Sequence, residues 1–229
     1  MFSRGLFTKR GMKMKFLITI FMTLFAFTAS AYVVPTYRDL KPASQQMIEK
    51  QSIVNPVVAN STRLKSAQAT TSSATTTIST FSAQPDVPRA LTVTTGGTTA
   101  DCNAGNVVVS GTNIFGKAIT ESLAITENQA GATAGTKAFK TVTSVLIPIQ
   151  DGNGCTYDVG VGDQLGLKAC LENAGHVIQA VFNGAYEATR PTCVADADEV
   201  EKNTCDINGT LDGAKTVQLF FMQNFACKP

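Results

Sequence analysis

The sequence lacks most of the residue patterns with which enzymes do chemistry. It contains no tryptophan and one histidine, and charged residues make up only 16% of it, a balance that suits a β-rich surface better than a helical enzyme. There is no G-x-S-x-G sequence, no G-x-x-x-x-G-K-[ST] loop and no G-x-G-x-x-G turn before a helix. These absences argue against a serine hydrolase and against nucleotide binding. We therefore expect no catalytic residue, no cofactor and no small-molecule substrate.

Neither the single histidine nor the distribution of basic residues supports catalysis or nucleic-acid binding. The single histidine, His176, opens a β-strand pattern, where a surface or interface position is the ordinary interpretation. Residues 1–31 hold five of the 19 basic residues and no acid, so the rest of the chain carries a net charge of −3. That balance removes the positive footprint of a nucleic-acid-binding protein.

The first 31 residues have the organisation of an export signal. A basic region runs to Lys15, an apolar stretch follows over residues 16–27, and Ala29-Ser30-Ala31 supplies the small residues of a cleavage site. Twelve helical residues reach about 18 Å, which is too short for a hydrocarbon core of about 30 Å. We expect cleavage near Ala31. An uncleaved anchor, or an upstream extension before a later start, is the alternative.

Six cysteines follow this segment, and an even number behind an export signal indicates disulfide bonds. Cys193 and Cys205 bracket a short acidic segment and form the first candidate pair, whose loop would contribute about 3 kcal/mol. Cys102 and Cys155 both sit in glycine-flanked turns and form the second. Zinc is the competing interpretation, but the sequence has no Cys-x-x-Cys pair. The remaining disulfide candidates, whose pairing the sequence leaves open, are Cys170 and Cys227.

Short alternations of apolar and polar residues, separated by Gly, Asp and Asn, predict an all-β fold. In residues 156–161, for example, Tyr157, Val159 and Val161 share one face. Turn signals such as Gly96-Gly97 separate the runs. The pattern predicts an antiparallel β-sandwich of the jelly-roll or Ig-like kind. The expected strands are Thr77–Phe81, Ala90–Thr94, Asn106–Ser110, Lys117–Thr126, Ala138–Ile149, Thr156–Val161, Val177–Phe182, Tyr186–Thr189 and Thr216–Met222.

The texture of the sequence divides the chain into four parts. After residues 1–31, residues 32–75 are expected to form an extended arm, because they include a Ser/Thr/Ala-rich stretch and one short helix at most, over residues 39–50. Residues 76–169 hold the sandwich, and residues 170–229 add β-hairpins packed on it. The end of the chain is apolar and must be covered by the sandwich or by a neighbour. Its candidate interface residues are Phe220, Phe221 and Phe225.

An acidic run is the best candidate for a binding site. Closely spaced carboxylates supply oxygen ligands of the kind that Ca²⁺ prefers. The spacing does not match an EF-hand loop, and a run of charges is more often a solvated face. One further acid, Glu121, falls on the apolar side of its expected strand and needs a partner or an edge position. The weak calcium candidate consists of Asp196, Asp198, Glu199 and Glu201, with Asp206 as a possible addition.

Several segments, in one order, resemble a β-domain of virion structural proteins of tailed bacteriophages. The resemblance begins near residue 76 and covers about two thirds of the chain. It implies a capsid decoration (cement) or head-fibre-like protein that is multimeric, binds the major capsid protein or other virion proteins, and resides in the virion. It names no catalytic residue. The segments are Gln84–Arg89, Gly111–Asn113, Ile119–Glu121, Lys137–Thr143, Gly160–Asp163, Leu165–Leu167, Asp198–Asn203 and Phe220–Phe225.

Three functional hypotheses follow. The leading one is a virion structural protein that stabilises the shell through protein–protein contacts. The alternative is a secreted or cell-surface bacterial adhesion or pilus-like module with structural disulfides, which the export-like start and the cysteines favour. A carbohydrate-active enzyme that uses Glu199 or Glu201 comes third, because the separation of a catalytic carboxylate pair is spatial and composition does not exclude it.

Overall fold

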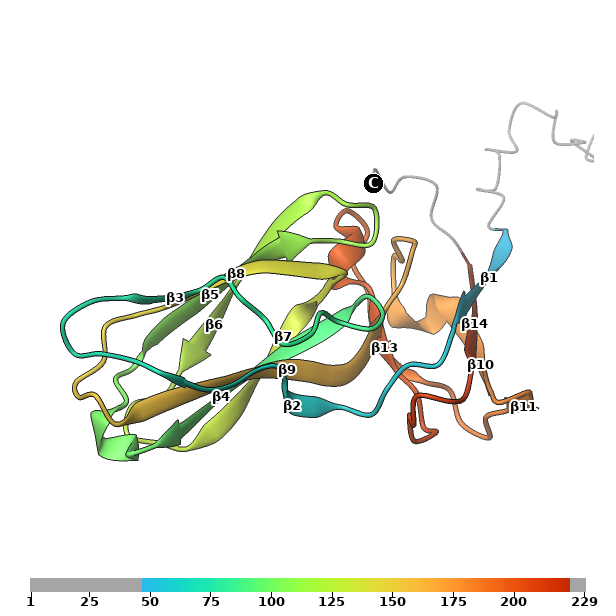
Figure 1. The fold of residues 1–229 in the computed structure, drawn as a ribbon. Helices are drawn as coiled ribbons and strands as arrows, with labels where there is room; N and C mark the ends of the chain where they lie inside the picture. The colour runs from blue at the N-terminus through green and yellow to red at the C-terminus, as the bar shows by residue number, and fades with distance from the viewer. Residues whose placement is uncertain (1–46, 223–229) are drawn as a thin grey trace, which may run out of the picture. The chain divides into compact units, whose positions relative to one another are not determined.

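The structure is a computed structural model, and it describes residues 47–222. In this range fourteen strands and three short 3-10 helices are arranged in antiparallel sheets (Figure 1). The prediction of an all-β, sandwich-like fold is confirmed. The strands are β1 (Ile48–Ile53), β2 (Asn60–Ala69), β3 (Thr76–Ile78), β4 (Arg89–Gly97), β5 (Gly105–Thr112), β6 (Ala118–Ile125), β7 (Gly131–Phe139), β8 (Thr141–Ile147), β9 (Cys155–Gly166), β10 (Val177–Phe182), β11 (Ala185–Tyr186), β12 (Thr192–Val194), β13 (Thr204–Asp206) and β14 (Val217–Met222). The 3-10 helices are η1 (Thr99–Asp101), η2 (Ala174–His176) and η3 (Val200–Lys202).

Two of the sheets form the predicted sandwich. The outer sheet has the strand order β3-β8-β5-β6, and the central sheet has the order β12-β13-β9-β4-β7, with β2 paired to β9. Alternate residues of β4, β5 and β9 are apolar and point between the two sheets, where they are buried. Tyr157, Val159 and Val161 share the buried face as expected. The sandwich core also contains Leu64, Leu91, Val93, Val107, Val109, Leu123, Phe139, Val145 and Ile147.

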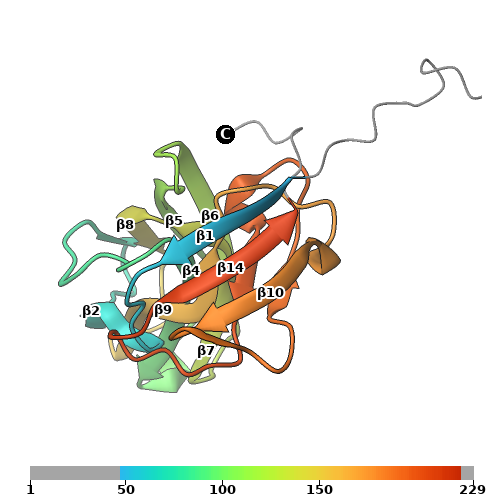
Figure 2. The same cartoon turned by 90° about the vertical axis from the view of Figure 1, so that its right-hand side faces the viewer.

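A third sheet, which we call the terminal sheet, has the order β1-β14-β10-β11. Its edge strand β1 pairs with β14 and so joins opposite ends of the described chain, since Ile48 pairs with Met222 and Ile53 with Val217. Figure 2 looks onto β1, β14 and β10, which lie side by side. The inward face of this sheet covers a second core, the terminal core, which contains Ile53, Leu165, Leu167, Ala169, Leu171, Val177, Ala180, Cys205, Ile207, Leu211, Val217, Leu219 and Phe221.

The long strand β9 connects the two cores. Its first half, including Tyr157, belongs to the sandwich core, whereas Leu165 near its end belongs to the terminal core. Gly160 allows this strand to pass under β2, because a Cβ there would lie 2.0 Å from the carbonyl oxygen of Asn60. The two cores are therefore built on one continuous strand.

The strand predictions hold best where alternation is strong. β10 has the predicted bounds, and the turn after it contains Asn183 and Gly184, both with positive φ, as a tight hairpin requires. The single strand expected over residues 138–149 is wrong. It is the end of β7 followed by β8, with a break at Lys140. Most of β7 was not predicted, because its Gly, Ala and Thr residues carry little hydrophobic signal.

The arm expected over residues 32–75 is, in its described part, integrated into the fold. β1 is a strand of the terminal sheet, so the helix expected over residues 39–50 is wrong for Ile48 to Lys50, and residues 39–46 lie outside the described range. β2 is polar along most of its length, but Leu64 is fully buried in the sandwich core. A single apolar residue gave too weak a signal to predict this strand. The expected export signal, residues 1–31, also lies outside the described residues.

Both candidate disulfides are present. Cys102–Cys155 has a Cα–Cα distance of 5.1 Å and belongs to the sandwich core. Cys193–Cys205 has a Cα–Cα distance of 4.1 Å and joins β12 to β13 beside the terminal core. Cys170 is fully buried and also disulfide-bonded, and Cys227 lies outside the described residues. Each core therefore has its own cross-link.

A fully buried arginine fixes the chain between β1 and β2 against the central sheet. Arg89 donates from Nη1 to the carbonyl oxygen of Val57 at 2.8 Å and pairs with Asp86 at 3.1 Å. Its Nε donates to the carbonyl oxygen of Gly162 on β9 at 2.8 Å, and its Nη2 donates to the same oxygen. Asp86 in turn accepts the Val57 N–H at 2.8 Å. A buried charge is tolerated here because every partner is supplied by the fold.

Candidate functional site

The outward face of the terminal sheet carries several apolar side chains that remain accessible to solvent. In β14, Val217, Leu219 and Phe221 are buried and point into the terminal core, so Phe220 and its neighbours in the alternation point outward. The prediction of Phe221 as an interface residue is therefore wrong, since this side chain is completely buried. Phe220 lies on the open face, and Phe225 lies outside the described residues.

The neighbouring strands add further apolar side chains to this face. Ile48 on β1 is 66% exposed and pairs with Met222, and Tyr186 on β11 is 76% exposed. Phe220 lies between Lys50 on one side and Gln179 on the other. We call this surface the terminal face and define it by Ile48, Lys50, Gln179, Tyr186, Phe220 and Met222.

Lys50 is the one positive charge in this set of residues, and it is exposed. Within residues 47–222 no carboxylate forms an ion pair with it. Its neighbour Glu49 is already paired with Lys168. The terminal face thus combines apolar and aromatic side chains with one unpaired cation, which is a composition suited to contact with another protein.

The acidic run predicted as a calcium site forms a network with lysines. Lys202 lies 3.5 Å from Asp196 and 3.2 Å from Glu199, and Lys137 lies 3.3 Å from Glu199. Asp196 Oδ1 also accepts the backbone N–H groups of Asp198 and Glu199 at 2.9 and 2.8 Å. Among the described residues no group of three acidic, cysteine or histidine side chains is arranged to hold a metal ion. The carboxylates of Asp196, Glu199 and Glu201 already contact lysines, backbone donors or Asn113, so the calcium interpretation has no geometric support.

The pKa values of this run follow from the same contacts. The hydrogen bond from the Glu199 N–H lowers the pKa of Asp196 below its usual range, and Lys202 adds to the effect. Desolvation raises the pKa of Glu199, but hydrogen bonds from Lys202 and Lys137 outweigh it and leave the pKa lowered. Asp196 and Glu199 therefore remain ionised to lower pH than free carboxylates do.

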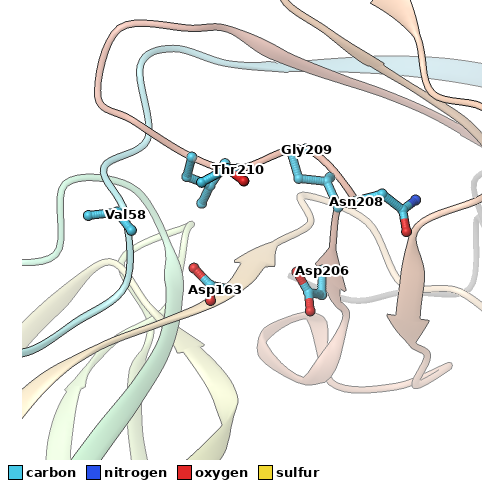
Figure 3. Close-up of a pocket in the computed structure, with 8 residues that line it drawn as sticks. Val58, Asp163, Asp206, Asn208, Gly209 and Thr210 are labelled. Atoms are coloured by element: carbon cyan, nitrogen blue, oxygen red, sulfur yellow. The ribbon is translucent and has the colours of Figure 1, made fainter.

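A small pocket of about 190 Å³ lies beside the segment that follows β13. Figure 3 shows Asp163 of β9 and Asp206 of β13 on one side of it and Gly209 and Thr210 on the other. Partial burial, together with the negative charges of Asp163 and Glu187, raises the pKa of Asp206 above its usual range. Asp206 belongs to this pocket and not to the acidic run. The volume is below the range of about 300–1,000 Å³ typical of small-molecule sites.

His176 is buried within the chain, so the expectation of a surface or interface histidine is wrong. Only 9% of its surface is exposed, and Nε2 lies 3.0 Å from Nδ2 of Asn173. The Nδ1 atom has no hydrogen-bond partner in the structure. Among the described residues, no serine and no acidic side chain forms a hydrogen bond with this imidazole.

Two polar groupings escaped prediction because their members come from distant parts of the sequence. One is the Arg89 network already described. The other joins Asn113, Lys137 and Glu201, which lie in three of the segments that carry the phage-like resemblance. Nothing in the local sequence around any of the three indicates that they meet.

Comparison with known proteins provides no relative. No family model matches the chain, and neither the curated proteins nor the solved structures include a significant match. Separately, no helix in residues 47–222 is both long and apolar enough to cross a membrane.

Proposed function

We propose that this chain is a non-enzymatic structural protein of a virion that stabilises the shell by docking its terminal face onto the major capsid protein. The observation that carries the proposal is the open, apolar outer face of the terminal sheet, with Phe220 near its middle. Exposed aromatic and aliphatic side chains on a rigid sheet are the usual anchors of protein–protein contacts.

The charge on this face specifies the partner surface. Lys50 pairs with Phe220 in the register of β1 and β14, so it lies within the apolar area. Burying that ammonium group in an interface without a partner would cost several kcal/mol. The docking surface on the capsid protein therefore presents apolar side chains around one carboxylate.

The architecture supports a role in a particle. The Cys102–Cys155 and Cys193–Cys205 disulfides, one in each core, resist unfolding outside the cytoplasm, and short turns with few charged residues suit a compact, protease-resistant subunit. Repetition of one modest interface over a symmetric lattice multiplies its effect. The phage-like segments support a virion in preference to other assemblies.

The test is to identify the chain in purified particles by mass spectrometry and to add purified protein back to particles that lack it. Ile48→Asp and Lys50→Glu should each abolish rebinding, because both residues are exposed and belong to the terminal face. Phe115→Asp is the matched control: Phe115 is 52% exposed but lies on the β5–β6 turn. Absence from mature particles, or loss of rebinding with Phe115→Asp alone, contradicts the proposal.

A second candidate is a secreted or cell-surface adhesion module, and the disulfides are the observation that favours it. For this function the mature chain begins near Tyr32 and is found in the periplasm or medium of cells that carry no phage. N-terminal sequencing of the fractionated protein distinguishes the two candidates.

A further inference from the structure

Two side chains from separate elements, those of Lys137 and Asn113, meet at the buried carboxylate of Glu201. Glu201, in η3, lies with Oε1 3.8 Å from the Nζ of Lys137 on β7. Its other oxygen, Oε2, accepts a hydrogen bond from the Nδ2 of Asn113 at 3.2 Å. One carboxylate therefore contacts both an amine and the amide nitrogen of an asparagine, although the three residues are far apart in the sequence.

The amide of Asn113 is polarised on its oxygen side. Oδ1 accepts the backbone N–H groups of Phe115 and Lys117 at 3.0 and 3.1 Å. Two N–H donors directed at one carbonyl oxygen stabilise the negative charge that develops there when a nucleophile attacks the carbon, as in an oxyanion hole. The β5–β6 turn thus holds the amide in a geometry that favours attack at Cγ.

Burial removes water from this cluster. Asn113 is completely buried and Glu201 is 6% exposed, while 21% of the Lys137 side chain remains accessible. The backbone at this point of β7 is also held in place, because Glu121 Oε1 accepts the Lys137 N–H at 3.2 Å and the Thr136 N–H at 2.6 Å. Glu121, which the sequence left without a partner, fixes the strand that carries the amine.

We propose that Lys137 and Asn113 form an intramolecular isopeptide bond, with Glu201 as its catalytic residue. Glu201 takes a proton from the Lys137 ammonium, and the neutral Nζ attacks Cγ of Asn113, which places the negative charge on Oδ1 between the Phe115 and Lys117 N–H groups. Glu201 then delivers this proton to Nδ2 and takes the second proton from Nζ as the tetrahedral intermediate collapses, and this second proton passes to the departing ammonia. The Nζ–Cγ bond forms, the Cγ–Nδ2 bond breaks, and ammonia leaves, so no oxidant or further reactant is needed.

The flexible four-carbon stem of Lys137 allows Nζ to move past Oε1 of Glu201 towards Cγ. In the unreacted chain Lys137 is also paired with Glu199 at 3.3 Å, but no hydrogen bond joins Glu199 to Asn113. Glu199 therefore holds the amine without touching the amide. This difference makes Glu199 the natural comparison for Glu201.

The bond would join the two sheets of the sandwich covalently. Asn113 directly follows β5 of the outer sheet, and Lys137 lies on β7 of the central sheet. Unlike a disulfide, such a bond persists in a reducing compartment, where a virion assembles. This cross-link would stabilise the folded chain in whichever particle or surface the chain resides.

The test is mass spectrometry of the purified full chain after reduction and denaturation. The expected mass is lower than that of the reduced sequence by one molecule of ammonia. Trypsin should release a branched peptide in which residues 90–117 are joined to residues 118–140, because a modified Lys137 is no longer cleaved. Cyclisation at an Asn-Gly pair such as Asn153-Gly154 also loses ammonia, but it produces no branched peptide.

Variants identify the roles of the residues. Lys137→Arg and Glu201→Gln should each give the unmodified mass and no branched peptide, whereas Glu199→Gln should retain the cross-link. Circular dichroism before digestion establishes that each variant is folded. A wild-type chain without the branched peptide after prolonged incubation overturns the proposal. A cross-link that persists in Glu201→Gln overturns the catalytic role, and one that passes through Lys140 overturns the assignment of the amine.

Discussion

The sandwich core and the terminal core differ in how they are covered. The sandwich core lies between two sheets, and strands close in sequence, such as β5 and β6, supply much of its outer wall. The terminal core has one sheet on one side, and on the other it relies on β13, the end of β9 and connecting segments around Leu171, Ile207 and Leu211. The pairing of its edge strand β1 with β14 closes most of the described chain into one loop.

This difference explains why the outer face of the terminal sheet is open and apolar. In the sandwich, each sheet buries one face and keeps polar residues such as Thr120 and Ser122 on the other. In the terminal sheet the outward positions of β1 and β14 include Ile48 and Phe220. The solvent-exposed face of an antiparallel sheet normally carries polar residues at such positions. The terminal sheet therefore leaves apolar side chains exposed on its outward face, a feature that also occurs where proteins dock onto one another.

The largest effect that would test this comparison comes from Arg89, which holds the segment between β1 and β2 against the central sheet. We expect Arg89→Met to destabilise the chain by about 4 kcal/mol, because Asp86 then keeps a largely buried charge without its partner. Arg63→Met is the control: Arg63 is more exposed and lies 4.0 Å from Asp86, so its loss should cost less than about 1 kcal/mol.

Urea unfolding monitored by hydrogen exchange would locate the loss. If the two cores are separable, exchange in β1 and β14 should rise in the Arg89→Met chain while β5 and β6 stay protected. Equal loss of protection in both groups of strands would show that the cores behave as one cooperative unit and would break the comparison.

The disulfides provide the next effect, with a different size for each core. Cys102–Cys155 spans 53 residues and Cys193–Cys205 spans 12. The chain-entropy model gives about 4 kcal/mol for the longer loop and about 3 kcal/mol for the shorter. Each pair can be replaced by serines and the free energy of unfolding measured in denaturant. The loss of stability should be larger for the Cys102–Cys155 pair. The reverse order would mean that the terminal core depends on its cross-link more than its packing indicates.

The sequence predicted the sandwich core better than the terminal core, for a physical reason. Strands such as β5 and β6 alternate between apolar and polar residues because each has one buried and one wet face, and that alternation is readable locally. β2 could not be predicted, since Leu64 is its one fully buried apolar residue. The short strands β12 and β13 depend on a disulfide and on pairing with β9, which are long-range conditions.

Sites that depend on local sequence were also easier to predict than sites that depend on long-range packing. The Cys193–Cys205 and Cys102–Cys155 pairs were found because turns and spacing constrain disulfides locally. Phe221 was misassigned because composition identified an apolar strand without showing which face would be buried. The Asn113–Glu201–Lys137 cluster was missed because it is created only by the packing of η3 against β7 and the β5–β6 turn.

A smaller effect compares one buried amide in each region. Asn203, beside the terminal core, accepts the N–H groups of Leu171 and Asp196 and donates to two carbonyl oxygens, each at 2.9 Å. Gln150, beside the sandwich core, accepts from Asn103 and Tyr157 and donates to Pro148. We expect Asn203→Ala to cost about 3 kcal/mol and Gln150→Ala about 2 kcal/mol, because more backbone groups lose their partners in the first case.

Thermal and chemical denaturation of both variants would measure this difference. A larger loss for Gln150→Ala would show that the connecting segments of the terminal core find other partners, and that this region is held by its apolar contacts alone.

The smallest expected effect is a gain in stability at the edge of the terminal core, where Asp206 lies near Asp163 and Glu187. Desolvation and these two charges raise the pKa of Asp206 in the folded chain, so ionising it opposes folding. The penalty is absent below the ordinary aspartate pKa of about 3.9, grows as the pH rises to the folded pKa, and is complete above it. Asp206→Asn should therefore stabilise the chain at neutral pH, by about 0.5 kcal/mol after solvent screening, and should make no difference in acid.

Asp212→Asn is the matched control with the opposite sign. A hydrogen bond from Lys215 lowers the pKa of Asp212, so its charge favours folding above the ordinary aspartate pKa, and that contribution is lost as the pH falls through the lowered value. Denaturant unfolding at acid and neutral pH should show the Asp206 variant gaining stability at neutral pH and the Asp212 variant losing it. If both variants shift in the same direction, the repulsion between Asp206, Asp163 and Glu187 is not what separates this pocket from the rest of the surface.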